Sequence, residues 1–176
     1  MRVFFTSDTH FGHGGALGLF KRPFASVAAM DEALVCRWNA VVRPEDEVWH
    51  LGDFALRRTP AAMEALLARL AGRKHLVAGN NDGPATLALE GWASVQAYAE
   101  IELQERSVVL CHYPFRSWNG MRRGALNLHG HTHGRLAPLL PRQIDVGVDV
   151  RDFRPVTLDE LLEALAARRR RRAPRT

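Results

Sequence analysis

Residues 3–10 read Val-Phe-Phe-Thr-Ser-Asp-Thr-His, an apolar run that ends in side chains able to bind a metal. In so short a segment, β-branched and aromatic residues favour a buried strand over a helix. Asp8 and His10 would then lie just beyond the carboxyl end of that strand. Ligands of open α/β sheets bind at such ends. The segment therefore predicts both a fold class and a site.

The same arrangement recurs four more times along the chain. Predicted strands at residues 47–51, 75–78, 107–111 and 125–128 are followed by, in order, Gly52-Asp53, Gly79-Asn80-Asn81-Asp82, His112 and His129-Gly130-His131-Thr132-His133. If these strand ends share one edge, the polar segments converge on a single crevice.

The intervening patterns predict the rest of the fold. Apolar residues at three- and four-residue steps indicate a helix over 26–42, and an N-cap, an N1 proline and a closing glycine indicate another over 61–71. A short helix is expected at 84–89 and a loop at the glycines of 12–18. Strands are expected at 94–103 and 144–148, and a capping box at Thr157 and Glu160 begins a last helix that the arginines of 168–172 continue. This order predicts an α/β sandwich with two sheets or one mixed sheet and helices outside.

Composition excludes several classes of protein. The 176 residues are 47% hydrophobic and 24% charged, as in a globular protein of one domain, and no apolar run is long enough to span a membrane. The first residues are too short an apolar run for a secretory signal, so a cytoplasmic location is expected. Cys36 and Cys111 make no disulfide framework, and both are expected to be buried, reduced thiols.

The net charge of +5 is unevenly distributed. Residues 168–176 hold six of the 24 basic residues and no acid, so residues 1–167 carry 18 basic against 19 acidic residues. We expect a domain over 1–167 and a basic, disordered tail over 168–176. The tail could contact nucleic acid. However, the chain has 22 arginines against two lysines, so its many arginines reflect a general preference for arginine, which favours a tail that is simply solvated.

The residue types at the strand ends suit a pair of transition-metal ions. Asp8 and Asp53 offer carboxylate oxygens, Asn80 offers an amide oxygen, and four histidines offer ring nitrogens: His10, His112, His131 and His133. Two ions about 3.5–4 Å apart need a bridging ligand, and they favour hydrolysis of phosphoesters. The alternative is a set of capping and hydrogen-bonded core residues, which any one of these residues alone would favour.

These segments resemble the calcineurin-like metallophosphoesterase family, and in particular its small bacterial and phage-type members. The matching blocks, in the order of the family, are Asp8-x-His10, Gly52-Asp53, Gly79-Asn80-x-Asp82, His112 and Gly130-His131-x-His133. The resemblance implies a four-layer αββα sandwich with two mixed sheets and a dinuclear metal site at the carboxyl ends of the strands. It implies that Asp8, His10 and His133 hold one divalent ion and Asn80, His112 and His131 a second. Asp53 would bridge them, and a hydroxide between the ions would be the nucleophile. Manganese is the first candidate, with Fe, Zn, Co or Ni as alternatives.

One position departs from the family pattern. Asn81 stands where the family commonly has a histidine that faces the phosphate and protonates the leaving group. An amide can donate a hydrogen bond to a phosphate but cannot act as a general acid. We therefore expect Asn81 to bind substrate, and His13 is the nearest candidate for the missing acid.

Several polar residues lie outside these matching blocks. Arg116, with Trp118 and Asn119, could line the substrate groove. His50 and His129 are expected to pack in the core or support ligands. Asp145 and Asp149 could orient ligand histidines or form turns, and His75 is given no role.

The expected function is metal-dependent hydrolysis of phosphoesters, as a phosphodiesterase or a broad-specificity phosphoesterase. One alternative is a nuclease or cyclic-phosphate RNA phosphodiesterase. The other is a non-catalytic metal-binding scaffold, which Asn81 would permit. The expected partner is a phosphoester substrate, without a membrane; nucleic acid is possible but not favoured, and the oligomeric state stays open.

Overall fold

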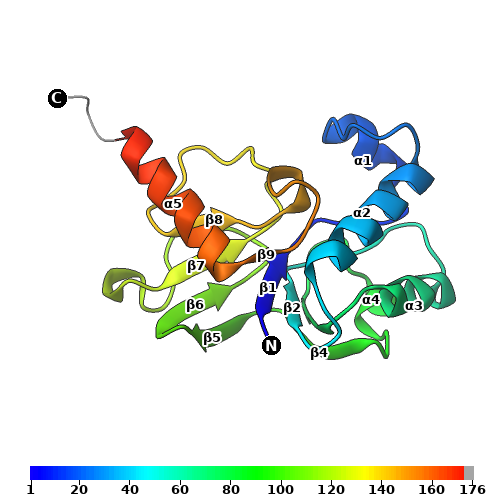
Figure 1. Ribbon diagram of the computed structural model, residues 1–176, viewed down its shortest axis with the longest axis horizontal. Coiled ribbons are helices and arrows are strands. Elements are labelled where there is room, and N and C mark those ends of the chain that lie inside the picture. Colours follow the sequence, from blue (N-terminus) through cyan, green and yellow to red (C-terminus); the bar gives the residue numbers. More distant parts are fainter. Residues whose placement is uncertain (173–176) are drawn as a thin grey trace.

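Two mixed β-sheets form the centre of the computed structural model, which describes residues 1–172 (Figure 1). The first sheet has the order β4-β3-β2-β1-β9 and the second the order β5-β6-β7-β8. The strands of the first sheet are β1 (Val3–Thr6), β2 (Glu47–His50), β3 (Arg73–Val77), β4 (Trp92–Gln96) and β9 (Val156–Thr157). Those of the second are β5 (Ala99–Leu103), β6 (Arg106–Leu110), β7 (Leu126–His129) and β8 (Gln143–Asp145). Each sheet has parallel strands and one antiparallel edge strand, β9 or β5, which confirms the predicted α/β fold with two mixed sheets.

Helices cover the outer face of the first sheet. They are α1 (Gly14–Leu19), α2 (Val27–Val41), α3 (Pro60–Arg69) and α4 (Pro84–Leu87). Because side chains alternate along a strand, Phe4 of β1 packs outward in one core with Trp38 of α2 and Leu67 of α3. Ser26 caps α2 through its hydroxyl, and Thr59 caps α3 in the same way, ahead of Pro60. The predicted signals for these two helices are therefore confirmed.

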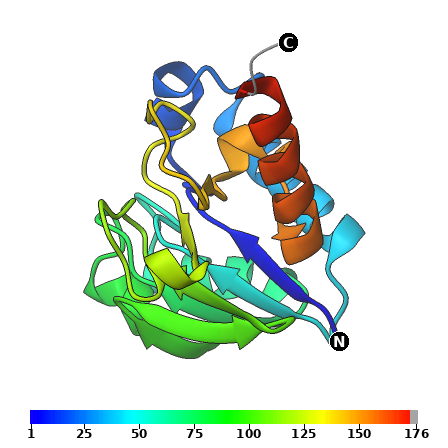
Figure 2. The same cartoon turned by 90° about the vertical axis from the view of Figure 1, so that its left-hand side faces the viewer.

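A second core fills the space between the sheets. Phe5, the next residue of β1, faces inward and packs with Val108 of β6 and Leu126 of β7. The last helix, α5 (Leu158–Arg172), adds Leu161 and Leu165 to this core and lies beside β1 and β9. Figure 2 shows α5 steeply inclined to one side of the strands. This second core holds the two sheets together, so that the loops from both sheets meet at one end.

The far face of the second sheet has a different cover. Val109 of β6 packs there against Trp118 and Ala125, in the segment that joins β6 to β7. This segment contains a short 3-10 helix, η1 (Met121–Arg123). In the expected sandwich, a full layer of helices would cover this face of the second sheet. Among the described residues, the segment between β6 and β7 covers it instead.

Four local predictions differ from the structure. Residues 14–19 form the helix α1 rather than a loop, although three of the six are glycine. The strand expected at 94–103 is two strands, β4 and β5, which belong to different sheets. The strand expected at 144–148 is β8 followed by a 3-10 helix, η2 (Val148–Val150). Cys36 is exposed, because it lies on the solvent side of α2, whereas Cys111 is buried as expected.

The basic end of the chain continues α5 as far as Arg172, so the expected boundary at residue 167 falls within a helix. The Arg168 guanidinium donates to the carbonyls of Gln143 and Leu140, which attaches this part of the expected tail to the second sheet. Residues 173–176 lie outside the described residues, and the disorder expected for the tail stays a prediction. Within the described part of the chain, no helix has the length and apolar character that crossing a membrane requires.

Candidate metal centre

The polar segments that follow β1, β2, β3, β6 and β7 meet at one end of the two sheets. Backbone hydrogen bonds join them directly: the amide of Asp8 donates to the carbonyl of Gly52, and the amide of Gly130 donates to that of His112. A bridge between Ser7 and Gly147 connects the loop of the first sheet to that of the second. The convergence predicted from the strand ends is therefore present in the fold.

Asp53 lies between a histidine of each sheet. Its Oδ2 is 3.5 Å from Nε2 of His10, which follows β1, and its Oδ1 is 3.6 Å from Nε2 of His112, which follows β6. The carboxylate is 2% exposed. With one oxygen toward each histidine, Asp53 would be placed to be shared between two ions.

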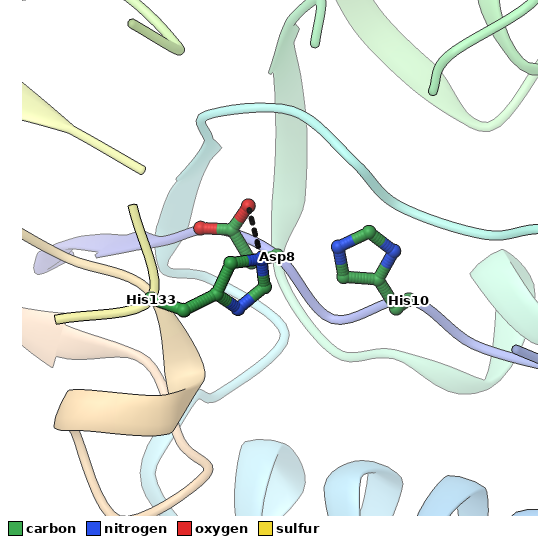
Figure 3. A group of neighbouring side chains, drawn as sticks. All are labelled: Asp8, His10 and His133. Atoms are coloured by element: carbon green, nitrogen blue, oxygen red, sulfur yellow. Dashed lines mark ion pairs between the residues drawn. The ribbon is translucent and has the colours of Figure 1, made fainter. Parts of the chain in front are cut away.

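Asp8, His10 and His133 form one cluster, which we call the first-metal side (Figure 3). Asp8 and His10 come from the segment after β1, and His133 from the loop after β7. Nε2 of His133 is 3.9 Å from Oδ1 of Asp8, and the rings of His10 and His133 are stacked with centroids 5.3 Å apart. Ligand atoms from all three residues lie within 4.8 Å of one another.

His10 provides the test of whether this cluster fits a metal. It is 2% exposed, and neither ring nitrogen has a hydrogen-bond partner among the described residues. A buried polar group without a partner costs about 1–3 kcal/mol. Burial lowers the pKa of His10 to about 3, so the ring is neutral and can offer a lone pair. A metal ion would satisfy this ring.

The charge around Asp8 leads to the same conclusion. Burial, followed by the neighbouring carboxylates Asp145 and Asp53, raises the pKa of Asp8 well above its usual value. Buried carboxylates that destabilise one another's charged form are stabilised by a cation placed among them.

Asn80, His112 and His131 form the second-metal side. Nε2 of His112 lies 3.1 Å from the amide oxygen of Asn80, and the rings of His112 and His131 are 5.1 Å apart. Nδ1 of His112 donates to the carbonyl of Leu51 over 2.7 Å, which leaves Nε2 free to bind a metal. Asn80 and His131 are exposed, whereas His112 is fully buried.

The backbone at this centre is strained. Five of the seven candidate ligands have positive φ angles: Asp8 58°, His10 50°, Asp53 60°, His131 65° and His133 47°. Non-glycine residues rarely adopt this conformation, and it costs of the order of 1–3 kcal/mol per residue. Gly52, at φ +90°, permits the tight approach of the β2 and β3 loops, because a Cβ there would lie 2.5 Å from the amide nitrogen of Gly79. Strain concentrated at the ligands is a feature of functional sites.

A buried arginine supports the first-metal side. The Arg22 side chain is 0% exposed and donates two hydrogen bonds, each of 2.8 Å, to the carboxylate of Asp149. The same guanidinium also donates hydrogen bonds to the backbone carbonyls of Thr9 and Asp8. Asp149 in turn accepts from Nδ1 of His133 over 2.7 Å, which orients Nε2 toward Asp8.

Sequence reasoning missed Arg22, because its ion pair spans 127 residues. For Asp149 the structure favours the orienting role over the turn-forming one.

Other carboxylates shape the loops. Asp82 accepts from the amides of Asp53, Phe54 and Gly79, and so holds the β2 loop against the β3 loop. Asp145 accepts from the Thr132 hydroxyl and the Gly134 amide, within the loop that carries His131 and His133.

The remaining histidines lie in supporting positions. His50 and His129 are fully buried; His50 hydrogen-bonds to Thr9, and His129 to the carbonyl of Gly130. His75 lies outside the centre, where it bonds to Ser94 and stacks on Trp49.

The residues expected to meet substrate lie in different environments. The Asn81 amide nitrogen donates to Oδ2 of Asp53 over 2.6 Å, and its backbone amide donates to Oδ1 over 2.8 Å. The ring of His13 is 5.4 Å from that of His10 and is partly exposed. Burial, followed by the cations of Arg57 and Arg22, lowers the pKa of His13. The substrate roles of Asn81 and His13 stay predictions.

The loop after His112 divides into an exposed and a buried part. Arg116 is exposed, whereas Trp118 is 8% exposed and packs in the core under the second sheet, so Trp118 does not line a groove. Asn119 donates to Glu100 instead of facing the centre. The expectation for Arg116 stays a prediction.

Comparisons with known proteins identify the family of the chain. Residues 1–140 match the family model of the calcineurin-like phosphoesterase superfamily domain. The chain is 30% identical over 171 residues to an uncharacterised protein of Methanocaldococcus jannaschii. The alignment covers 93% of this chain and 91% of that protein. It is 33% identical over 192 residues to the gene 66 protein of Mycobacterium phage D29, with coverage of 92% and 94%.

A solved structure shows the same fold. The crystal structure of a protein of unknown function from Aquifex aeolicus superposes with a TM-score of 0.75 at 24% identity, covering 92% of this chain and 98% of that one. The match over residues 1–140 and the relatives of 30% identity or more show the family. The chain belongs to the calcineurin-like phosphoesterase superfamily.

Proposed function

We propose that this chain is a cytoplasmic, dinuclear metal-dependent phosphodiesterase or broad-specificity phosphoesterase, with manganese as the first candidate metal. The observation that carries the proposal is Asp53, a buried carboxylate with one oxygen toward His10 and the other toward His112. Membership of the superfamily supports metal-dependent hydrolysis of phosphoesters in general.

The proposal gives each candidate ligand a role in holding the two ions. Asp8, His10 and His133 would hold one ion, Asn80, His112 and His131 would hold the other, and Asp53 would bind both. When bound, such a pair lowers the pKa of water and stabilises the charge that develops on a phosphoryl group in transfer. The hydrogen bonds from Nδ1 of His112 to Leu51 and from Nδ1 of His133 to Asp149 direct each Nε2 into the site, where its lone pair would be available to a metal.

His13 and Asn81 have separate roles in the proposal. His13 lies beside His10 and is partly exposed, so this ring could carry a proton to a leaving group. Asn81 holds the Asp53 carboxylate through two donors, and its amide could also donate to a phosphate oxygen.

Hydrolysis of bis-p-nitrophenyl phosphate with Mn²⁺ tests the proposal. The purified protein should release nitrophenol above the rate of Mn²⁺ in buffer, and Asp53→Asn should reduce the rate to that background. Asp152→Asn, a change of an exposed carboxylate, is the matched control and should retain activity. Activity that survives Asp53→Asn, or a metal-loaded wild type without activity, would contradict the proposal; the latter result would favour the non-catalytic scaffold.

The nuclease alternative rests on the arginines at the end of α5. It predicts cleavage of short RNA that weakens with added salt and on removal of residues 169–176, since phosphate contacts are salt-dependent. This truncation retains Arg168, which contacts the second sheet. Cleavage that is unchanged by both would contradict binding through the tail.

A further inference from the structure

Two aromatic side chains flank the candidate metal centre, and they differ in what they contact. Phe20 stacks face to face on His133, with ring centroids 3.5 Å apart at 11°, and the guanidiniums of Arg22 and Arg135 lie 5.4 and 5.5 Å from its ring centre. Its ring is thus engaged by the protein itself. Phe20 supports the first-metal side and offers little surface to a substrate.

Tyr113, on the second-metal side, is 45% exposed. Its ring meets His112 at 75° with centroids 5.1 Å apart, and His131 at 64° with centroids 4.8 Å apart. Both are edge-to-face contacts, so neither histidine stacks parallel on the Tyr113 ring, and part of the ring stays exposed. A large, exposed aromatic ring is thereby fixed beside two candidate ligands.

The neighbours of Tyr113 make the same side accessible. Asn80 and His131 are both exposed, so a phosphoester that reaches the second-metal side meets solvent-facing groups. A planar group attached to that phosphoester would be within the reach of the Tyr113 ring. Stacking of a base on an aromatic side chain stabilises binding by about 1–3 kcal/mol.

The geometry points to Tyr113 as a specificity-determining residue that binds a planar ring carried by the phosphoester, as in an aryl ester or a nucleotide. This inference rests on the proposed function and narrows its substrate class. A phosphoester with only small alkyl groups would bind without this contribution.

Three diesters with one leaving group test the inference. Methyl, phenyl and thymidine 5′ esters of p-nitrophenyl phosphate carry the same nitrophenyl ring and release the same nitrophenol, so differences in kcat/KM among them report the retained group. With Mn²⁺, the wild type should give a kcat/KM at least fivefold higher for the phenyl or thymidine ester than for the methyl ester. A preference for phenyl alone would indicate an aryl substrate, and a preference for thymidine alone a nucleotide.

Variants of Tyr113 separate stacking from support of the histidines. Tyr113→Phe should retain the ring preference, whereas Tyr113→Leu should remove most of it, mainly through KM for the ring-bearing esters. Tyr98→Leu is the control, because Tyr98 is 40% exposed but contacts Phe115 rather than a candidate ligand. If Tyr113→Leu lowered kcat/KM equally for all three esters, Tyr113 would only support the histidines and the inference would be wrong.

A binding measurement keeps this test independent of turnover. Calorimetric titration of the Mn²⁺-loaded protein with thymidine 5′-monophosphate and with inorganic phosphate should show tighter binding of the nucleotide, and Tyr113→Leu should remove the difference. A wild type that hydrolyses the diesters without any ring preference would overturn the inference alone. A wild type that hydrolyses none of them would overturn the proposed function, and the titration would still decide the role of Tyr113.

Discussion

Asp8 and His10 on the first-metal side are almost fully buried, whereas Asn80 and His131 on the second-metal side are exposed. Hydrogen bonds from the buried guanidinium of Arg22 to Asp149, and from His133 to Asp149, support the first side. Among the described residues, the second side has no equivalent buried cation, and its exposed ring is that of Tyr113. In the proposed centre, the first side would be a preorganised half that retains its metal and the second an open half that receives substrate, because preorganisation lowers the cost of binding.

The largest expected effect comes from the buried cation. Arg22→Gln would leave the carboxylate of Asp149 buried without its ionic partner, and loss of one member of a buried ion pair costs about 3–5 kcal/mol. Urea unfolding should show this loss in the free energy of unfolding. Arg116→Gln, at an exposed arginine, should change stability by no more than about 0.5 kcal/mol. Equal effects of the two changes would remove the proposed contrast between the sides.

The next effect concerns the second side and its neighbour Asn81. Asn81→His would introduce a general acid, which contributes roughly 10²–10⁴ in rate where the leaving group is poor. We expect about a 100-fold gain on an unactivated ester and a much smaller gain on a nitrophenyl ester, measured as kcat. The variant also loses the hydrogen bond from the Asn81 amide to Asp53, so its metal content should be measured alongside. An equal change on both esters would mean that the acid is not missing and would favour His13 in that role.

A smaller effect is expected at the carboxylate that orients His133. Asp149→Asn keeps the size of the side chain but weakens its bond to Nδ1 of His133. It also removes the anionic partner of Arg22, so the metal titration is made on protein shown by urea unfolding to be folded. Loss of such support lowers metal affinity by about 10–100-fold. Mn²⁺ titration should show the loss in the tighter of two binding events and leave the weaker one unchanged. A loss confined to the weaker event would reverse our assignment of the sides.

The smallest expected effect is a dependence of the free energy of unfolding on pH, and it comes from the buried His50. Burial lowers the pKa of His50 to about 3, whereas in the unfolded chain it stays near 6.5. The unfolded state therefore takes up a proton that the folded state does not, and stability falls as pH drops from 6.5 toward 3.

The expected slope is about 1.4 kcal/mol per pH unit for this one group. Urea unfolding at pH 5.5 and at pH 4.5, both well between the two pKa values, measures it for wild type and His50→Gln. The variant should show a slope reduced by this amount; an unchanged slope would mean that His50 does not contribute.

The seven candidate ligands could be located from sequence, because strand ends and metal-binding residue types coincide at every one of them. The long helices could be predicted as well, since Ser26 and Thr59 are strong caps. Arg22 could not be found, because nothing near it in the chain marks its pairing with Asp149.

The errors in secondary structure have equally local causes. The glycines of α1 favour a loop, and tertiary packing overrides them: Ala16 is fully buried and Phe20 stacks on His133. The chain leaves the first sheet after Gln96 and enters the second at Ala99, a change that the strand-like composition of residues 94–103 does not reveal. Cys36 is expected to be buried because free cysteines usually are, but it lies off the buried face of α2, which Met30, Leu34 and Trp38 form.

Titration of the metal-free protein with Mn²⁺ tests the central claim most directly. Two ions should bind per chain, in a tight and a weaker class, with Asp8→Ala removing the tight class and His131→Ala removing only the weaker one. Binding of a single ion, or two classes that respond to these variants in the opposite way, would contradict a dinuclear centre with one buried and one open side.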